Sequence, residues 1–105
     1  MTIKEFYRKF NENVDTVNVE GVVWYKADDV YDFLEIDDKS KVVSEIDANN
    51  KEKFKLDSYG EFVFLNQDGL DDIIFSVNTP IAREYQRIVV KIMVSIRQKG
   101  FYGEI

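Results

Sequence analysis

Residues 79–100, with the sequence TPIAREYQRIVVKIMVSIRQKG, decide the fold because they predict one long amphipathic helix. Thr79 is suited to cap the first turn, and Pro80 falls at the first helical position, where its missing N–H costs nothing. Gly100 follows the basic last turn and can adopt the left-handed backbone that ends a helix. These signals predict a helix from Pro80 to about residue 99.

Apolar side chains recur along this stretch at steps of three and four residues, which places them on one helix face. They are Ile81, Tyr85, Ile88, Val89, Ile92, Met93 and Ile96. So long a stripe must be covered, and we expect the preceding strands to cover it. Val90 and Val94 lie off the stripe among basic residues, which favours a protein contact such as a second subunit, with cover by a flanking loop as the alternative.

The charge of the chain is divided unevenly. Its 14 basic and 20 acidic residues give a net charge of −6. The helical stretch holds five basic residues and one acid, Glu84, a net charge of +4, which leaves −10 for the rest. The net negative charge argues against indiscriminate nucleic-acid binding, while any partner meets two surfaces of opposite sign.

The chain contains neither cysteine nor histidine. Disulfides, thiolate metal sites and nucleophile–histidine pairs are therefore excluded. No apolar run approaches the length of a membrane span, and residues 1–11 carry four charges instead of a signal-peptide core. We expect an intracellular protein, in the cytoplasm or the nucleus, with no membrane partner.

The rest of the chain predicts an α+β fold in which small antiparallel hairpins pack against several helices. We expect helices at residues 2–10, 28–34, 38–46 and 70–77, and strands at 14–19, 22–26, 53–57 and 61–65. The order indicates two small hairpin units, each followed by helices. Asp28 or Asp29 is the expected cap of the second helix. No linker or repeat interrupts the chain, so we expect a single domain over residues 1–105.

Three blocks, in order, resemble a known family. Residues 21–30 (GVVWYKADDV) and 65–70 (LNQDGL) match its first two signature blocks, and the third is matched by Ala82, Tyr85, Val89, Met93, Ser95, Ile96, Arg97, Gly100 and Tyr102. The chain is identified as a member of the Bro-N domain family. This domain is the N-terminal module of BRO proteins of large DNA viruses and of phage antirepressors.

The resemblance implies a viral or prophage protein that binds DNA and interferes with transcription. It also implies that a complete protein continues into a C-terminal domain, which these 105 residues do not contain. The chain departs from the family at Ile88, where tryptophan is usual, and at Val94, where proline is usual. The cations that normally precede the last helix are missing from residues 76–82.

The two short helices at residues 28–34 and 38–46 form the first candidate site, because such a pair is typical of a helix-turn-helix. The second helix would present Lys39, Ser40, Lys41 and Ser44 to DNA. Two packed structural helices are the simpler interpretation. Asp37 and Asp38 lie where a phosphate would bind, and Glu35 replaces the glycine often found in that turn.

The basic side of the long helix forms the second candidate site. Arg83, Arg87, Lys91 and Arg97 follow one edge and could track a phosphate backbone, although a charged helix edge is often only a solvated surface. Asp28, Asp29 and Asp32 are close enough to share a divalent cation, but helix capping explains aspartates at a helix start more simply. We find no catalytic constellation and expect neither an enzyme nor a cofactor or metal.

The sequence therefore supports two hypotheses. In the first, a regulatory module binds DNA through Lys39, Lys41 and the four basic residues of the long helix. In the second, an acidic protein-binding module blocks a repressor or host-defence protein without nucleic acid. Its contacts would be the acidic run Asp28, Asp29, Asp32, Asp37 and Asp38 or the pair Val90 and Val94. A homodimer is compatible with both.

Overall fold

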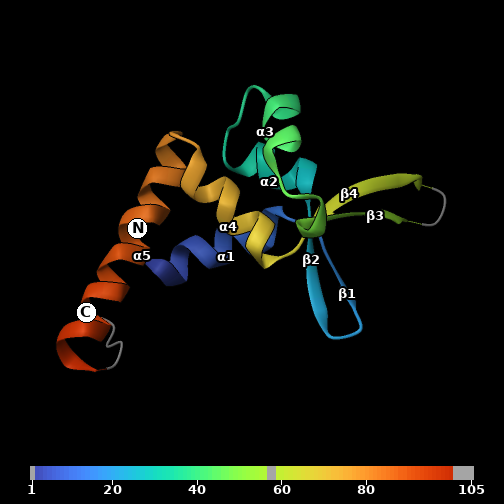
Figure 1. Ribbon diagram of the computed structural model, residues 1–105. Helices are drawn as coiled ribbons and strands as arrows, with labels where there is room; N and C mark the ends of the chain where they lie inside the picture. The colour runs from blue at the N-terminus through green and yellow to red at the C-terminus, as the bar shows by residue number, and fades with distance from the viewer. Residues whose placement is uncertain (1, 57–58, 101–105) are drawn as a thin grey trace.

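The computed structural model describes residues 2–56 and 59–100. Helices and strands alternate in pairs after the first helix (Figure 1). They are α1 (Ile3–Asn13), β1 (Thr16–Val19), β2 (Val22–Lys26), α2 (Ala27–Phe33), α3 (Lys39–Glu45), the short 3-10 helix η1 (Ala48–Asn50), β3 (Lys51–Lys55), β4 (Glu61–Leu65), α4 (Gln67–Ser76) and α5 (Pro80–Lys99). The predicted α+β class with a long C-terminal helix is confirmed.

All four strands belong to one antiparallel sheet in the order β1-β2-β4-β3. The two hairpins join through a short β2–β4 ladder, in which Tyr25 faces Leu65 and Lys26 faces Phe64. The expectation of two hairpin units was therefore incomplete, because hydrogen bonds between the inner strands merge them. Beyond this ladder the hairpins diverge, and their tips point away from the helices (Figure 1).

The hairpin turn at Glu20 and Gly21 has the backbone that a two-residue turn requires. Both residues have positive φ, 53° and 83°, and the Gly21 N–H donates to the Asn18 side-chain oxygen at 3.1 Å. Glycine enters this region without cost, whereas glutamate does not. The predicted turn is confirmed at this position.

The hydrophobic core lies where α1, α2 and α4 meet the joined ends of the hairpins. The most deeply buried side chains are Phe6, Val30, Tyr31, Leu34, Phe64, Leu65, Ile73 and Ile74. They come from helices and strands far apart in the sequence, so the core ties both hairpins to the helices. The Val42 and Val43 side chains lie outside the described part of the structure, whereas Ile46 is buried.

Helix α5 has the ends that its sequence predicts. The Thr79 hydroxyl accepts from the Ala82 N–H, Pro80 opens the helix, and Gly100 closes it with φ of 76°. The Gly100 N–H donates to the Ile96 carbonyl at 2.8 Å. These contacts satisfy backbone groups that a helix end leaves open.

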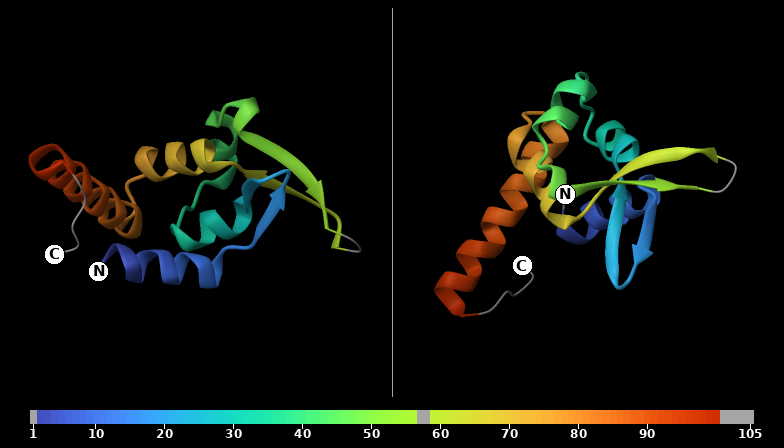
Figure 2. Two further views of the ribbon diagram at one scale, coloured as in Figure 1. Left: turned by 90° about the horizontal axis from the view of Figure 1, so that it is seen from below. Right: turned by 45° about the vertical axis from the view of Figure 1, so that its right-hand side comes forward.

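The packing partners of α5 differ from the prediction. The helix packs mainly against α4 and α1, and not against the strands. Tyr85 stacks on Phe6 of α1 with ring centroids 4.3 Å apart. The sheet lies at the other end of the molecule (Figures 1 and 2), because α1 and α4 stand between it and α5. The expectation that strands cover the apolar stripe was therefore wrong.

The molecule is elongated because α5 continues past the N-terminal end of α1 (Figure 1). Its radius of gyration is 14.9 Å. A compact chain of this length has a radius of gyration of about 13 Å. The last turns of α5 therefore extend past α1, although Ser95 within them is buried.

The predicted cap of α2 needs correction, and two other predictions fall on residues that the structure does not describe. Helix α2 begins one residue after Lys26, which makes no side-chain cap, so neither Asp28 nor Asp29 caps it. The Asp29 carboxylate instead accepts from the Asp15 N–H at 3.0 Å, tying α2 to the chain before β1. The expected strand end at residue 57 and the family residue Tyr102 lie outside the described residues.

Candidate nucleic-acid interface

The predicted basic edge of α5 is exposed. The side chains of Arg83, Arg87, Lys91 and Arg97 are all exposed. None of them pairs with a carboxylate among the residues that the structure describes. Steps of four residues place the first three on successive turns, about 6 Å apart along the helix axis. This edge thus offers several cations to one extended anion.

The first half of α5, residues 80–89 (the proximal half), is held firmly. The Gln86 side-chain amide donates to the Ile74 carbonyl at 2.7 Å and to the Val77 carbonyl at 3.2 Å. These carbonyls lie at the end of α4, where a helix leaves acceptors without internal donors. Gln86 therefore fixes the angle between α4 and α5 and with it the direction of the basic edge.

A buried tyrosine contact adds to this anchoring. The Tyr7 and Tyr85 hydroxyls are 2.7 Å apart, and the Tyr85 side chain is only 6% exposed. Burial raises the pKa of Tyr85 above its ordinary value, and the hydrogen bond with Tyr7 adds a smaller rise. The Tyr85 phenol therefore stays neutral at physiological pH, so it anchors α5 without adding charge.

The second half of α5, residues 90–99 (the distal half), has exposed apolar side chains. Val90 is 54% exposed and Val94 41%, which agrees with their predicted position off the stripe. Met93 and Ile96, on the predicted stripe, are 48% and 45% exposed. We call these four residues the distal patch. The periodic pattern of apolar residues does not show where the covering helices end. It therefore did not predict that Met93 and Ile96 are exposed.

The helix pair α2–α3 has a tight turn but a weakened basic surface. Glu35 has φ of 59°, so a glutamate occupies the left-handed conformation that glycine favours. The Lys39 ammonium lies 2.5 Å from an Asp32 carboxylate oxygen, and this hydrogen bond raises the pKa of Lys39. Lys39 is therefore occupied by a carboxylate of its own chain, which reduces what it offers a phosphate.

The start of α3 is capped from within the chain. The Asp38 carboxylate accepts from the Lys41 N–H at 3.2 Å. This capping bond explains the aspartate at a position where a DNA-binding helix would hold a phosphate. The Lys41 side chain is exposed. Ser44 donates to the Lys41 carbonyl at 2.7 Å, which turns its hydroxyl back onto the helix. Of the predicted contacts on this helix, Lys41 remains the best placed, and the Ser40 side chain lies outside the description.

The acidic run does not gather into one cluster. Asp29, Asp32 and Asp38 each bond to groups of the chain itself, as described above. Asp28 and Asp37 are exposed. Within residues 2–56 and 59–100, no group of three acidic side chains could hold a metal ion.

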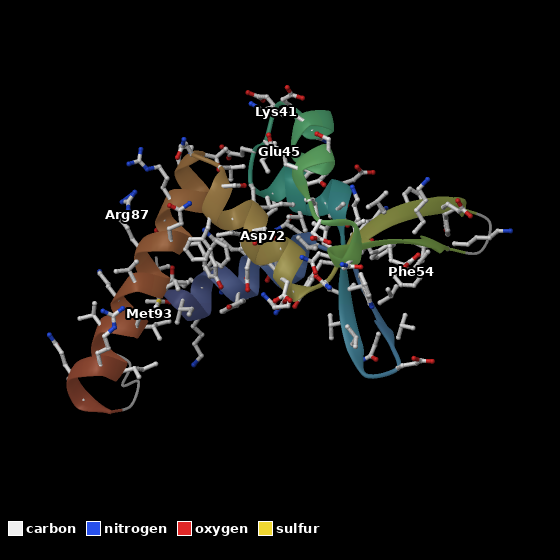
Figure 3. The ribbon with its side chains drawn as sticks, in the orientation of Figure 1. Lys41, Glu45, Phe54, Asp72, Arg87 and Met93 are labelled. Atoms are coloured by element: carbon white, nitrogen blue, oxygen red, sulfur yellow. The ribbon has the colours of Figure 1, made fainter. Side chains whose placement is uncertain are left out.

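The two basic regions lie apart. In Figure 3, Lys41 is at one end of the molecule on α3, whereas Arg87 points outward from α5 on another side. The residues predicted to bind DNA therefore do not form one continuous surface, and α5 holds the larger share of them.

Aromatic side chains from both hairpins meet on one face of the sheet, whereas the sequence predicted only the strands that carry them. Trp24 and Phe54 meet edge to face, with ring centroids 5.4 Å apart, and Phe54 also contacts Phe64. The Lys26 ammonium lies 4.1 Å above the centre of the Phe62 ring. These contacts bind the two diverging hairpins to each other. The alternation of aromatic residues along the strands was the available signal.

A small cavity between α1, α4 and the sheet is lined by the three tyrosines Tyr7, Tyr25 and Tyr85 together with apolar side chains. Its volume is about 40 Å³. Pockets for small organic ligands measure roughly 300–1,000 Å³. The cavity is therefore a packing feature of the core.

No helix in the described residues is both long enough and apolar enough to span a membrane.

Fold and site together define a small α+β domain with a cationic helix edge. The family described as BRO family, N-terminal domain, matches residues 13–94. The chain belongs to this family, as its sequence blocks predicted. No curated protein and no solved structure gave a match.

The family blocks carry the fold more than the site. Asn66 caps α4 by accepting from the Gly69 N–H at 2.9 Å, and its amide donates to the Asn50 side chain at 3.2 Å. A Cβ atom on Gly69 would lie only 2.7 Å from the Asn50 carbonyl oxygen. Ala82 and Tyr85 are buried. Capping and packing thus explain these four residues of the family blocks, whereas Met93, Ile96 and Arg97 of the third block are exposed.

Proposed function

We propose that this domain is a viral or prophage regulatory module that binds DNA through the basic edge of α5 and interferes with transcription inside the host cell. The observation that carries the proposal is the exposure of Arg83, Arg87, Lys91 and Arg97 without carboxylate partners in the described structure. Membership of a family of regulatory, DNA-binding domains supports it.

Electrostatics favour α5 over any other contact with a polyanion. The helix carries +4 on a chain whose remainder carries −10. Because the acidic residues outside α5 repel phosphates, DNA would approach along α5, the described helix with the largest excess of cations. Such binding releases counterions and weakens steeply with salt.

Helix α3 makes a smaller contribution to the proposed contact. Lys41 is free to reach a phosphate, whereas Lys39 must first leave Asp32. We therefore expect Lys41→Ala to weaken DNA binding less than any single change among the α5 arginines.

DNA titration at two salt concentrations tests the proposal. Fluorescence anisotropy of labelled double- and single-stranded DNA is measured with the wild type and with the double variant Arg83→Ala, Arg87→Ala. We expect wild-type affinity to fall with salt, and the double variant to lose affinity and about two units of the salt slope.

The matched control is the double variant Arg8→Ala, Lys9→Ala, which removes two exposed cations from α1. It removes the same two positive charges from the net charge as the α5 double variant does. It should therefore keep the wild-type salt slope and lose only a little DNA affinity at every salt concentration. Equal loss in both double variants would mean that only net charge matters. Absence of binding to either DNA at low salt would refute the proposal.

A protein-binding function without nucleic acid is the second candidate, and the exposure of the distal patch favours it. In this alternative the domain blocks a repressor or a host-defence protein. Asp28 and Asp37 would be the acidic contacts, because Asp29, Asp32 and Asp38 already bond within the chain. Binding to such a protein that persists after nuclease treatment, with no DNA binding, would support this candidate over the first.

A further inference from the structure

The distal patch is an apolar surface with a basic border. Val90, Met93, Val94 and Ile96 lie in the distal half of α5 and are exposed, and Figure 3 shows Met93 on this half of the helix. Arg97 follows Met93 and Val94 by four and three residues, so its side chain lies beside theirs on the helix surface. Val90, Met93 and Val94 share this side of the helix with Arg97, whereas Ile96 lies on the side of the predicted stripe. Exposed apolar side chains that adjoin one another, as the first three do, mark a contact with another molecule.

The outer face of α4 has the opposite character. Asp68, Asp72 and Phe75 follow each other at steps of four and three residues and are all exposed, Phe75 by 51%. Neither aspartate has an ion-pair partner in the described part of the chain. The other face of the helix buries Leu70, Ile73 and Ile74 in the core. This face, the α4 stripe, therefore combines acid charge with one large apolar side chain.

We propose that the distal patch of one copy of this chain docks on the α4 stripe of a second copy, and that two copies form a symmetric dimer. The surfaces are complementary in charge, because Arg97 would approach Asp68 and Asp72 of the partner. In the dimer this pairing would leave Arg83, Arg87 and Lys91 for the proposed DNA contact. They are also complementary in chemistry, because Phe75 would pack against the exposed valines. A two-fold axis uses both contacts twice, since each copy supplies one patch and one stripe.

Pairing the distal patch with itself would be less favourable. Such a contact would bring Arg97 and Lys99 of both copies to one interface, with no acid from the distal half to balance them. Like charges placed together cost free energy and reject a partner. The α4 stripe avoids this repulsion.

The available apolar area suits a small dimer interface. Each copy offers Val90, Met93, Val94 and Phe75, which are about half exposed, so a symmetric contact would bury eight of them. At on the order of 80 Å² each, they supply about 640 Å². A standard interface buries roughly 1,600 Å² in total and is somewhat more than half apolar.

Sedimentation equilibrium without DNA tests the dimer directly, so its outcome does not depend on the proposed DNA binding. The chain has a mass of 12.3 kDa. We expect the average mass to rise toward twice this value as the protein concentration increases. A monomer at every concentration up to the millimolar range would overturn the proposal.

Apolar variants locate the contact. Val90→Glu with Val94→Glu should weaken dimerisation at least about tenfold, because it buries carboxylates in the apolar centre of the interface. Val19→Glu with Val22→Glu is the matched control, because these valines are similarly exposed on the β1–β2 hairpin. A dimer that the hairpin pair disrupts and the α5 pair does not would place the contact elsewhere and refute the assignment.

Charge reversal tests which surfaces meet. Asp72→Lys and Arg97→Glu should each weaken the dimer, and the variant carrying both should recover most of the wild-type association. Circular dichroism and thermal melting of each variant confirm that the fold is intact. Two weakening changes that simply add in the combined variant would refute the pairing of α4 with α5.

Discussion

The two halves of α5 share one hydrophobic pattern but have different surroundings. In the proximal half, Ala82 and Tyr85 are buried against α4 and α1. In the distal half, Met93 and Ile96 occupy equivalent positions of the pattern and are nearly half exposed. The pattern is continuous, while its cover ends part-way along the helix.

The difference separates stability from recognition within one helix. The proximal half has aromatic stacking and side-chain hydrogen bonds to α4, so it sets the position of the helix. The distal half carries exposed valines beside Arg97, and Ser95 is its one buried side chain among the described residues. We therefore expect changes in the proximal half to alter folding, and changes in the distal half to alter association.

The largest effect expected from this comparison comes from removing the aromatic anchor. Phe6→Ala should destabilise the domain by about 3–5 kcal/mol, because Phe6 is 1% exposed and stacks on Tyr85. Met93→Ala, in the distal half, should change the free energy of unfolding of the monomer by less than about 0.5 kcal/mol. Urea denaturation at low protein concentration measures both. Equal losses would show that the distal half is packed as firmly as the proximal half.

A smaller difference is expected from replacing one glutamine in each half of α5. Gln86→Ala should cost about 1–2 kcal/mol, because it leaves the Ile74 and Val77 carbonyls without their side-chain donor. Gln98→Ala, on the exposed distal half, should be within about 0.5 kcal/mol of the wild type. Thermal unfolding of both variants checks this. A neutral Gln86→Ala would mean that water replaces the amide and that the anchor is weaker than the geometry indicates.

Local signals made α5 predictable, and long-range packing did not. Thr79, Pro80 and Gly100 act through bonds within a few residues, so the sequence alone located both helix ends. That a stripe needs cover also follows from its periodicity. Which element supplies the cover depends on contacts between α1 and α5, more than seventy residues apart, such as Tyr7 with Tyr85. No local pattern contains that contact.

The candidate site was predictable to the same degree. Helical spacing alone placed Arg83 and Arg87 on one exposed edge. The ion pair of Lys39 with Asp32 was not predicted, because it crosses the turn between two helices and depends on their angle. The cap at α2 was wrong for a similar reason, since Asp29 binds a backbone group before β1. Interactions across turns thus account for most of what the sequence did not show.

The smallest expected effect is a pH dependence confined to the proximal half. Burial raises the pKa of Tyr85, and a hydrogen bond with Tyr7 adds to this shift. The unfolded chain loses the phenol proton near pH 10, the ordinary tyrosine value. Above that pH the folded state retains more protons than the unfolded state, so stability is complete below pH 10 and falls as the pH rises toward the folded pKa.

Tyr85→Phe should lose about 1 kcal/mol at neutral pH, where only the hydrogen bond is missing. Above pH 10 its stability should decline less steeply than that of the wild type, because one of the protons bound only in the folded state is gone. Tyr59→Phe is the control, since Tyr59 is 80% exposed and should leave the pH profile unchanged. Denaturation midpoints measured between pH 8 and pH 11 distinguish the variants. If Tyr85→Phe declined as steeply as the wild type, the alkaline loss would come from the other buried tyrosine, Tyr31, whose pKa is raised by burial to about 12.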